Sequence, residues 1–226
     1  MRAVGSHPRV LDVGCGDGEV ARQLAALGCQ VTALDLRLRD TAPATNVTFV
    51  ERDFLEFEAA TPFDVLVFTA SLHHIAPLDQ AIRHAATLLM PGGRMIVDDF
   101  DLAAPDVETL TWYYELQELL AVAGVYRQDH LDAPAPDVKA RWQAAHHHEP
   151  ALHSGAVMRS ELSTRFVIRE LQRCEYLYRY IAAGLPRDDQ GQKLAAHIRR
   201  VERTKIVAGS VVPVGLRIVA VRPESV

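Results

Sequence analysis

The sequence contains little cysteine and no long apolar run. Its three cysteines are an odd number without the spacing of a disulfide framework. Together with the lack of a recognisable secretory signal, this predicts a protein of the reducing cytoplasm. No run of about eighteen apolar residues occurs, so we expect no helix that crosses a membrane.

Basic side chains are also in deficit, with 24 lysines and arginines against 29 aspartates and glutamates, a formal net charge of −5. Because phosphate contacts need clustered lysine and arginine, this balance disfavours nucleic acid as a partner. The densest basic segment, residues 197–205, has its apolar positions on one helical face, so we interpret its charges as the solvated opposite face.

No internal repeat or low-complexity segment is present. The chain has 226 residues, of which 49% are hydrophobic and 23% charged, an ordinary globular composition. Length and composition therefore predict one α/β domain of generous size, with room for a subdomain.

The most informative segment is Val10–Gly18, with the sequence VLDVGCGDG. Its first residues suit a buried strand, glycine then occupies every second position, and a helical pattern follows. Glycine allows a sharp turn and close approach of a ligand, and a helix N-terminus presents unpaired N–H groups. Asp35 ends a second apolar segment about twenty residues later, which favours a nucleoside site in a doubly wound α/β fold.

The glycine spacing differs from that of a dinucleotide site. The dinucleotide pattern is G-x-G-x-x-G, and here Glu19 stands where its third glycine would fall. A nicotinamide-dependent oxidoreductase is therefore a disfavoured alternative. Cys15 lies inside the turn, and we interpret it as a small residue between two glycines rather than as a nucleophile.

Strand and helix patterns alternate along the chain, which predicts right-handed crossovers and a mainly parallel sheet. We expect strands at residues 9–13, 30–34, 47–52, 63–69, 94–98, 166–171 and 215–221. We expect helices at residues 18–27, 78–90, 106–123, 175–183 and 190–207. Residues 125–160 have no clean period and are interpreted as an irregular or helical insertion.

Four motifs occur in order: LDVGCGDG, FDVLVF, SLHHI and LLMPGGRMIV. Together they resemble class I S-adenosylmethionine-dependent methyltransferases, in particular the small-molecule group related to ubiquinone-biosynthesis enzymes. The resemblance covers residues 9–100 well and residues 216–221 weakly, whereas the insertion matches no pattern.

The resemblance implies a fold and a division of the chain. The fold is α/β, with a doubly wound, mostly parallel, seven-stranded sheet whose last strand is antiparallel and lies beside the fifth. Residues 1–100 and 161–226 would form the cofactor-binding core. Residues 101–160 would form a helical or irregular lid over the substrate site, and the cofactor would be S-adenosylmethionine.

The resemblance also implies roles at the glycine turn. Gly14, Cys15 and Gly16 would pack under the methionine part and the ribose. Asp12 would orient the turn and the cofactor's amino group, although it also suits a turn cap. Asp35 would accept hydrogen bonds from both ribose hydroxyls.

Further contacts are implied at the ends of the next strands. Leu36 would lie against the adenine, and Asp53 would accept from the adenine amine, unless it simply ends its strand. Phe54 would lie beside the adenine ring, and a place in the hydrophobic core is the alternative. Thr69 and Ala70 would offer backbone carbonyls to the methionine ammonium.

Methyl transfer requires positioning of the nucleophile in line with the departing sulfur, and a base only if the nucleophile arrives protonated. His73, His74 and His148 are the candidates for that base. Successive helical side chains diverge by about 100°, so the run 146–148 cannot all face one ion. We expect no metal, and ligation by a subset of these histidines with Asp98 or Asp99 is the disfavoured alternative.

The sequence therefore predicts methyl transfer to an oxygen, nitrogen or carbon atom of a small organic acceptor, by a monomer or homodimer. A catalytically inactive module that binds S-adenosylmethionine or adenosylhomocysteine is the main alternative. Methylation of protein or nucleic acid is a further one, but strand four is followed by Thr69–Leu72, TASL, rather than by Asn-Pro-Pro-aromatic.

Overall fold

The computed structural model describes residues 7–38 and 42–224. Its strands are β1 (Arg9–Val13), β2 (Gln30–Asp35), β3 (Val47–Glu51), β4 (Phe63–Thr69), β5 (Leu89–Phe100), β6 (Val167–Cys174) and β7 (Gly215–Val221). Its α-helices are α1 (Glu19–Ala26), α2 (Leu78–Leu88), α3 (Val107–Val122), α4 (Val138–Ala145), α5 (Gly155–Leu162), α6 (Leu177–Ala183) and α7 (Asp189–Val207). Short 3₁₀ helices are η1 (Phe54–Glu56), η2 (Leu72–His74) and η3 (Gln128–His130).

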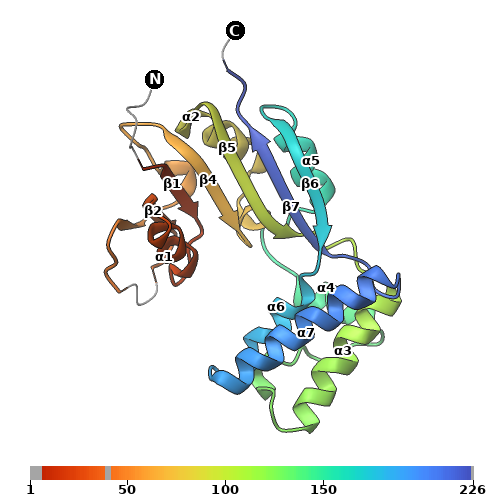
Figure 1. Cartoon of the computed structure of the whole chain (residues 1–226). Coiled ribbons are helices and arrows are strands. Elements are labelled where there is room, and N and C mark those ends of the chain that lie inside the picture. The colour runs from red at the N-terminus through yellow and green to blue at the C-terminus, as the bar shows by residue number, and fades with distance from the viewer. Residues whose placement is uncertain (1–6, 39–41, 225–226) are drawn as a thin grey trace. The chain divides into compact units, whose positions relative to one another are not determined.

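The strands form one seven-stranded sheet in the order β3-β2-β1-β4-β5-β7-β6. The pairs β1–β2, β1–β4, β2–β3 and β4–β5 are parallel. Figure 1 shows that β7 runs opposite to its neighbours and lies beside β5. The predicted doubly wound, mostly parallel fold is therefore confirmed.

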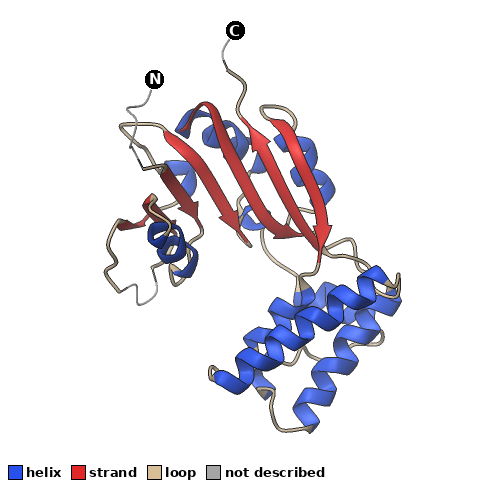
Figure 2. Ribbon diagram, viewed as in Figure 1, coloured by secondary structure: helices blue, strands red, loops and turns tan. Residues whose placement is uncertain are grey.

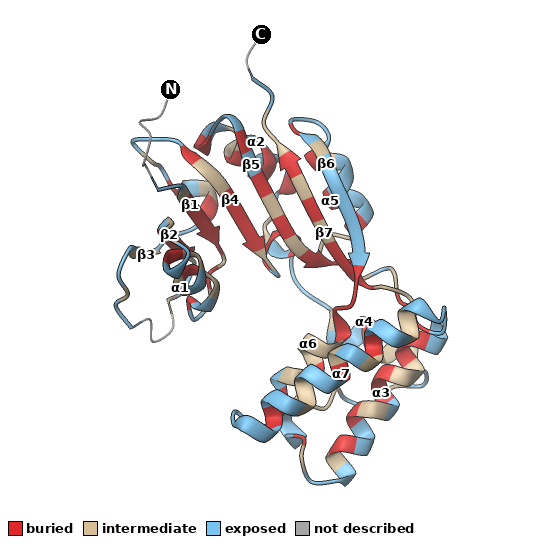
Figure 3. Ribbon diagram, viewed as in Figure 1, coloured by how far each residue is buried: buried red, intermediate tan, exposed pale blue. Residues whose placement is uncertain are grey.

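The buried residues of the sheet lie mainly in its central strands. Phe63, Leu66 and Phe68 of β4 are almost fully buried, as expected for a parallel strand covered on both faces. Figure 2 shows α2 and α5 behind the sheet. In contrast, the edge strand β6 is mostly exposed (Figure 3). The central strands thus form a buried base, and most of the predicted site residues lie at or beyond their carboxyl ends.

Strand β5 begins earlier than its sequence pattern predicts. The expected helix to Met90 ends at Leu88, and the expected strand start at Arg94 moves to Leu89. The register with β4 shifts here, so that residues 90–93 form an irregularity within the strand. Gly92, at a φ of +75°, donates its N–H to Arg222 O at 3.0 Å, which extends the pairing with β7.

The chain divides into two compact units. The sheet unit comprises Met1–Asp99, Gly155–Gln172 and Arg217–Val226, and the helical unit comprises Phe100–Ser154 and Arg173–Leu216. This division differs from the expected boundaries, because residues 173–216 lie in the helical unit and residues 155–160 in the sheet unit.

The packing of the helical unit explains this difference. Ile181 of α6 and Ile198 of α7 are buried in one cluster with Leu110 and Tyr113 of α3. A helix that buries its apolar face against α3 belongs to the same core, whatever its distance in sequence.

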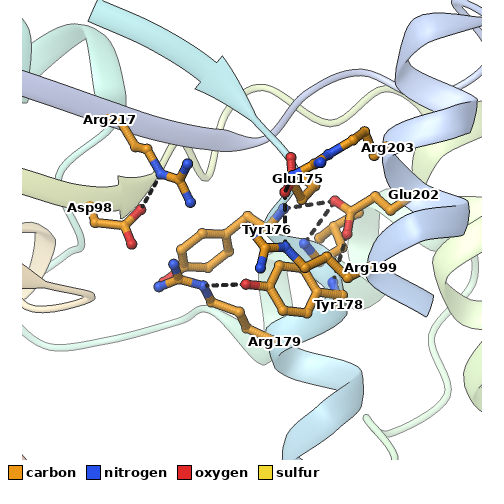
Figure 4. A network of polar contacts seen from close by, with 10 residues as sticks. Asp98, Glu175, Tyr176, Tyr178, Arg179, Arg199, Glu202, Arg203 and Arg217 are labelled. Atoms are coloured by element: carbon orange, nitrogen blue, oxygen red, sulfur yellow. Dashed lines mark hydrogen bonds and ion pairs between the residues drawn. The ribbon is translucent and has the colours of Figure 1, made fainter. Parts of the chain in front are cut away.

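Two glutamates tie α7 to the start of α6 (Figure 4). Glu202, with no exposed surface, accepts the backbone N–H groups of Tyr176, Leu177 and Tyr178 at 2.8, 3.0 and 2.9 Å. Its carboxylate therefore satisfies the free donors of the first turn of α6.

The neighbouring Glu175 accepts from Arg199 at 2.9 Å and from Arg203 at 2.6 Å (Figure 4). Burial alone would raise the pKa of Glu175, but hydrogen bonds from Arg203, the backbone and Arg199 together lower it to about 2. The helical unit is thus held by its own polar network as well as by its aromatic core.

Across residues 7–38 and 42–224, none of the helices combines the length and apolar character needed to cross a bilayer.

Candidate functional site

The glycine turn follows β1 and is hydrogen-bonded to β2. Gly14, Gly16 and Gly18 have φ angles of +74°, +57° and +80°, in the left-handed region that side chains disfavour. The N–H groups of Gly14 and Cys15 both donate to Leu34 O, at 2.8 and 3.0 Å. The turn is therefore fixed to the neighbouring strand before α1 begins at Glu19.

The space around the three glycines differs. A Cβ on Gly14 would lie 2.5 Å from Ser71 Cβ, and one on Gly18 would lie 2.6 Å from the Phe49 ring. A Cβ on Gly16 would have no heavy atom within 4 Å. The first and last glycines thus allow the chain to pack on itself, whereas Gly16 leaves open space that a ligand can fill.

Asp35 meets this open turn from the end of β2. Its Oδ2 accepts the N–H of Gly16 at 2.8 Å, and its Oδ1 accepts the N–H of Arg37 at 3.0 Å. Each carboxylate oxygen keeps a second lone pair for a ligand hydroxyl. The next residue, Leu36, is 64% exposed and offers apolar surface beside the carboxylate. This combination suits a sugar diol next to a flat ring.

Asp12 is a buried acid in the strand that leads into the turn. It is 1% exposed, and among the described residues neither carboxylate oxygen has a hydrogen-bond partner. Burial, and then the charge of Asp35, raise the pKa of Asp12 to about 7. An unpartnered buried carboxylate is costly, and it fits a site whose cation arrives with a ligand.

Cys15 is buried beside these acids. Burial first, and then the negative charges of Asp12 and Asp35, raise the pKa of its thiol to about 12. Because the thiolate is the nucleophile, this environment agrees with the interpretation of Cys15 as a packing residue.

Asp53 and Phe54 follow β3 and have different surroundings. Asp53 is exposed, and its Oδ1 accepts the N–H of Leu55 at 2.8 Å as the cap of η1. Phe54 is 5% exposed, with its ring edge-on to Phe68 at 5.5 Å and to His84 at 5.1 Å. This packing favours the core alternative for Phe54. The exposed Asp53, beside the end of β2, can still contact a ligand.

The end of β4 is strained and tied to both neighbours. Thr69 pairs with Asp98, and the N–H of Ala70 donates to Asp98 O at 3.0 Å. Ala70 has a φ of +51°, which is unusual for a residue with a Cβ. Ser71 Oγ donates to Val13 O at 2.6 Å, so this segment is also linked to the strand before the glycine turn.

The two adjacent histidines lie on η2, directly after this segment. His73 is buried, and its Nδ1 lies 2.7 Å from Oδ1 of Asp99, which has no exposed surface. Its backbone N–H donates to the other oxygen of Asp99 at 3.2 Å. His74 is exposed, with its ring centroid 4.0 Å from that of His73. The sequence pattern did not predict this pair, because Asp99 lies near the end of another strand, β5, 26 residues away.

The third candidate base has a different setting. His148 is exposed and belongs to the helical unit, whereas His73 and His74 belong to the sheet unit. Its neighbour His146 is packed 3.8 Å from the Trp142 ring, with Nδ1 2.9 Å from Trp142 O. In the part of the chain that the structure describes, no three histidine, cysteine or acidic side chains gather as metal ligands.

The chain matches the family model described as "Methyltransferase domain" over residues 2–133. The ubiquinone biosynthesis O-methyltransferase of Xanthomonas euvesicatoria pv. vesicatoria is 35% identical over 99 residues, which cover 39% of this chain and 41% of that protein. The ubiquinone biosynthesis O-methyltransferase of Caulobacter sp. is 36% identical over 101 residues, covering 39% of each chain. The match thus spans about two fifths of the length of these curated relatives.

Solved structures share the fold over nearly the whole chain. The N-methyltransferase NodS of Bradyrhizobium japonicum, in complex with S-adenosylhomocysteine, aligns with a TM-score of 0.52 and 16% identity. That alignment covers 97% of this chain and 80% of NodS. Phosphoethanolamine N-methyltransferase 2 of Haemonchus contortus, in complex with S-adenosylmethionine, aligns with a TM-score of 0.58 and 16% identity, covering 98% of this chain and 50% of that one.

Proposed function

The chain belongs to the class I S-adenosylmethionine-dependent methyltransferases, and we propose that it transfers a methyl group to an oxygen, nitrogen or carbon atom of a small organic acceptor. The observation that carries this proposal is the buried, unpartnered carboxylate of Asp12 beside an open glycine turn. When bound, S-adenosylmethionine supplies an electrophilic methyl group on a sulfonium, and it brings the cationic groups that Asp12 lacks. The chain's own task is to bind the cofactor and the acceptor, to orient them for the transfer, and to exclude water.

The glycine turn and the two acids would hold the methionine part and the ribose. Gly14, Cys15 and Gly16 pass beneath them, with the open space at Gly16 supporting close approach. Asp35 accepts from the ribose hydroxyls through lone pairs not used by Gly16 and Arg37. Asp12 then serves as the anionic partner of the amino group rather than as a turn cap, because it makes no capping hydrogen bond.

The following strand ends would bind the adenine and the ammonium. Leu36 offers an exposed apolar side chain to the ring, and Asp53 accepts from the adenine amine. Phe54 supports this edge from the core. Thr69 and Ala70 present carbonyls to the ammonium, and the strained backbone at Ala70 is typical of a binding segment.

The acceptor side involves the histidines and the helical unit. His73 and His74 follow β4 directly, and either supplies a base where the acceptor arrives as a hydroxyl or phenol. We propose that residues 101–160 act as the lid that excludes water, and His148 in this segment is the third candidate base. The formal charge of −5 supports a small molecule rather than nucleic acid as the acceptor.

We propose a protein of the reducing cytoplasm, and the lack of a disulfide among the described cysteines Cys15, Cys29 and Cys174 supports this location. We propose a monomer or homodimer as the working form.

Adenosylhomocysteine should stabilise the full chain against thermal unfolding. At about a hundred times its dissociation constant, a ligand that binds only the folded state adds roughly 2.7 kcal/mol. The Asp35→Ala variant should lose most of that response, because it removes the acceptor of both ribose hydroxyls. Asp64→Ala is the matched control: Asp64 accepts from Arg9 at the opposite end of β4, so that variant should keep the response.

Turnover separates an enzyme from a module that only binds the cofactor. Methyl-labelled S-adenosylmethionine is incubated with the full chain and a library of phenols, amines and activated carbon acids. Label transfer to an acceptor is the expected result. Binding of adenosylhomocysteine without any transfer would favour the inactive module, and binding of a nicotinamide dinucleotide instead would favour the oxidoreductase.

A further inference from the structure

We propose that the cofactor site releases one proton when it binds its ligand: Asp12 is a neutral carboxylic acid in the free protein and becomes the anionic partner of the ligand's ammonium in the complex. Asp12 thereby makes binding depend on a cationic amino group. This inference rests on the proposed function for the identity of the ligand, but every residue that carries it lies in the sheet unit.

The surroundings of Asp12 do not support a negative charge in the free protein. Its side chain is 1% exposed, and within the part of the chain that the structure describes neither of its oxygens accepts a hydrogen bond. An ionised carboxylate in such a place has neither water nor a donor to replace water, so the neutral acid is favoured. The pKa of Asp12 is accordingly raised to about 7, first by burial and then by the charge of Asp35.

Asp35, the second acid of the site, has the opposite environment. It ends β2 and accepts the backbone N–H groups of Gly16 at 2.8 Å and of Arg37 at 3.0 Å. These two donors stabilise its negative charge, and that charge disfavours a second one at Asp12. Asp35 is thus built as a resident anion of the site, whereas Asp12 is built as an acid that ionises when a cation arrives.

The sheet register places both acids beside the glycine turn. The partners of Asp12 in the neighbouring strands are Ala33 of β2 and Val67 of β4, and both are apolar. Asp35 ends β2 two residues after Ala33 and is hydrogen-bonded to Gly16 of the turn. Because the carboxyl ends of parallel strands meet at one edge of the sheet, a ligand at the turn meets both acids.

The charged groups of the turn and of α1 are occupied elsewhere. The thiol of Cys15 stays protonated, because burial and then the charges of the two acids raise its pKa to about 12. Asp17 is exposed, and its Oδ1 accepts the N–H of Glu19 at 3.2 Å. The side chains of Arg22 and Glu19 pair with each other at 3.7 Å. The cation for Asp12 therefore has to come with the ligand.

The segment after β4 also packs against this part of the sheet. Ser71 contributes a neutral hydroxyl, which donates to Val13 O at 2.6 Å. Of the two histidines that follow, His73 has its Nδ1 2.7 Å from a carboxylate oxygen of β5, which is not a neighbour of β1, and His74 is exposed. Among the described residues, Asp35 supplies the one charge that shifts the pKa of Asp12.

The exchange is balanced in protons and in charge. In the free site the carboxyl group of Asp12 keeps its proton. An ammonium in contact with the carboxyl lowers its pKa, as an opposite charge does at short range. The O–H bond of Asp12 then breaks, its electron pair stays on the carboxylate, and the proton goes to solvent. The ammonium keeps its own protons, so that one proton is released for each ligand bound.

Binding should therefore depend on pH with a defined sign. Above about pH 7 Asp12 is ionised in the free protein, and adenosylhomocysteine binds with full affinity. Below that value the ligand has to displace the proton, so its affinity should fall about tenfold per pH unit until the lower pKa of the complex is reached. Asp12→Asn should bind more weakly at pH 8 and equally at all pH values, so that its affinity approaches that of the wild type as pH falls.

5′-Methylthioadenosine tests whether the ammonium is the group that drives the release. It keeps the adenine, the ribose and the thioether of adenosylhomocysteine but lacks the amino acid part. Its affinity for the wild type should be the same at pH 6 and at pH 8. A tenfold loss at pH 6, equal to that of adenosylhomocysteine, contradicts the assignment of the ammonium to Asp12.

The closing experiment is titration calorimetry of the full chain with adenosylhomocysteine at pH 6 and pH 8. Each titration is repeated in two buffers of different ionisation enthalpy, which counts the protons released. We expect the wild type to release about 0.9 proton at pH 6 and about 0.1 at pH 8. Asp12→Asn should release none at either pH. Asp17→Asn is the matched control, because it neutralises an exposed acid of the same turn, and it should keep the wild-type values.

Each outcome decides the proposal. No release at pH 6, or the same release at both pH values, overturns it, and so does undiminished release in Asp12→Asn. If Asp12→Asn fails to fold, the two wild-type proton counts still decide. Binding without release leaves the proposed function standing, whereas the absence of binding at both pH values contradicts the proposed function and this inference together.

Discussion

Replacing Asp12 with asparagine should stabilise the protein without cofactor and weaken its binding of adenosylhomocysteine. The pKa of Asp12 is raised from 3.8 to about 7, and a difference of about three units at 1.36 kcal/mol each corresponds to up to about 4 kcal/mol. A neutral amide of the same shape removes this penalty. Stability gained by loss of a binding group is typical of sites held ready for a ligand.

The pH dependence of this gain has a defined sign. The folded state holds the Asp12 proton more tightly than the unfolded state, so ionisation destabilises the fold as pH rises from 3.8 to about 7. The penalty is absent below that window and complete above it. Urea unfolding should therefore show the full gain for Asp12→Asn at pH 8 and little gain near pH 4. A variant that is less stable than wild type at pH 8 would contradict the assignment.

Alanine substitutions at two positions of the glycine turn should separate the effect on folding stability from the effect on adenosylhomocysteine binding. Gly14→Ala should lower stability by about 3 kcal/mol, because a positive φ is strained and its Cβ meets Ser71 Cβ at 2.5 Å. Gly16→Ala should lower stability by only about 1 kcal/mol, because it has the strain of a positive φ but no clash of its Cβ. Its Cβ enters the open space at the turn, so adenosylhomocysteine affinity should fall more than tenfold.

Urea unfolding and calorimetry on the two variants measure both effects, and each variant is the control for the other. Equal losses of stability would contradict the difference in packing. Unchanged affinity in Gly16→Ala would show that the ligand does not approach the turn there.

Local sequence patterns predict the parts of the fold that depend on neighbouring residues. The strand, glycine turn and helix around Val10–Gly18 are contiguous, and the left-handed angles of Gly14, Gly16 and Gly18 follow from that spacing. The seven-stranded sheet and the placement of β7 beside β5 were available from the resemblance, whereas the full strand order was not predicted. Asp35 lies at the turn as expected, and its hydrogen bond to Gly16 adds the physical reason.

Contacts between distant segments were not predictable in the same way. The pairing of His73 with Asp99 depends on two strand ends, and neither residue carries a local signal of its partner. Residues 173–216 join the helical unit because α6 and α7 share a core with α3, which periodicity alone does not reveal. The position of the Phe54 ring was not predictable for the same reason, because it depends on the distant residues Phe68 and His84.

The most direct test of the central assignment is a crystal structure of the full chain grown with adenosylhomocysteine. The account predicts that its ribose hydroxyls lie within hydrogen-bond distance of Asp35, and that its ammonium lies on the side of Asp12. It also predicts that the ligand contacts the backbone at Gly16. Density for the ligand elsewhere, or a turn filled by the protein's own side chains at saturating ligand, would contradict it.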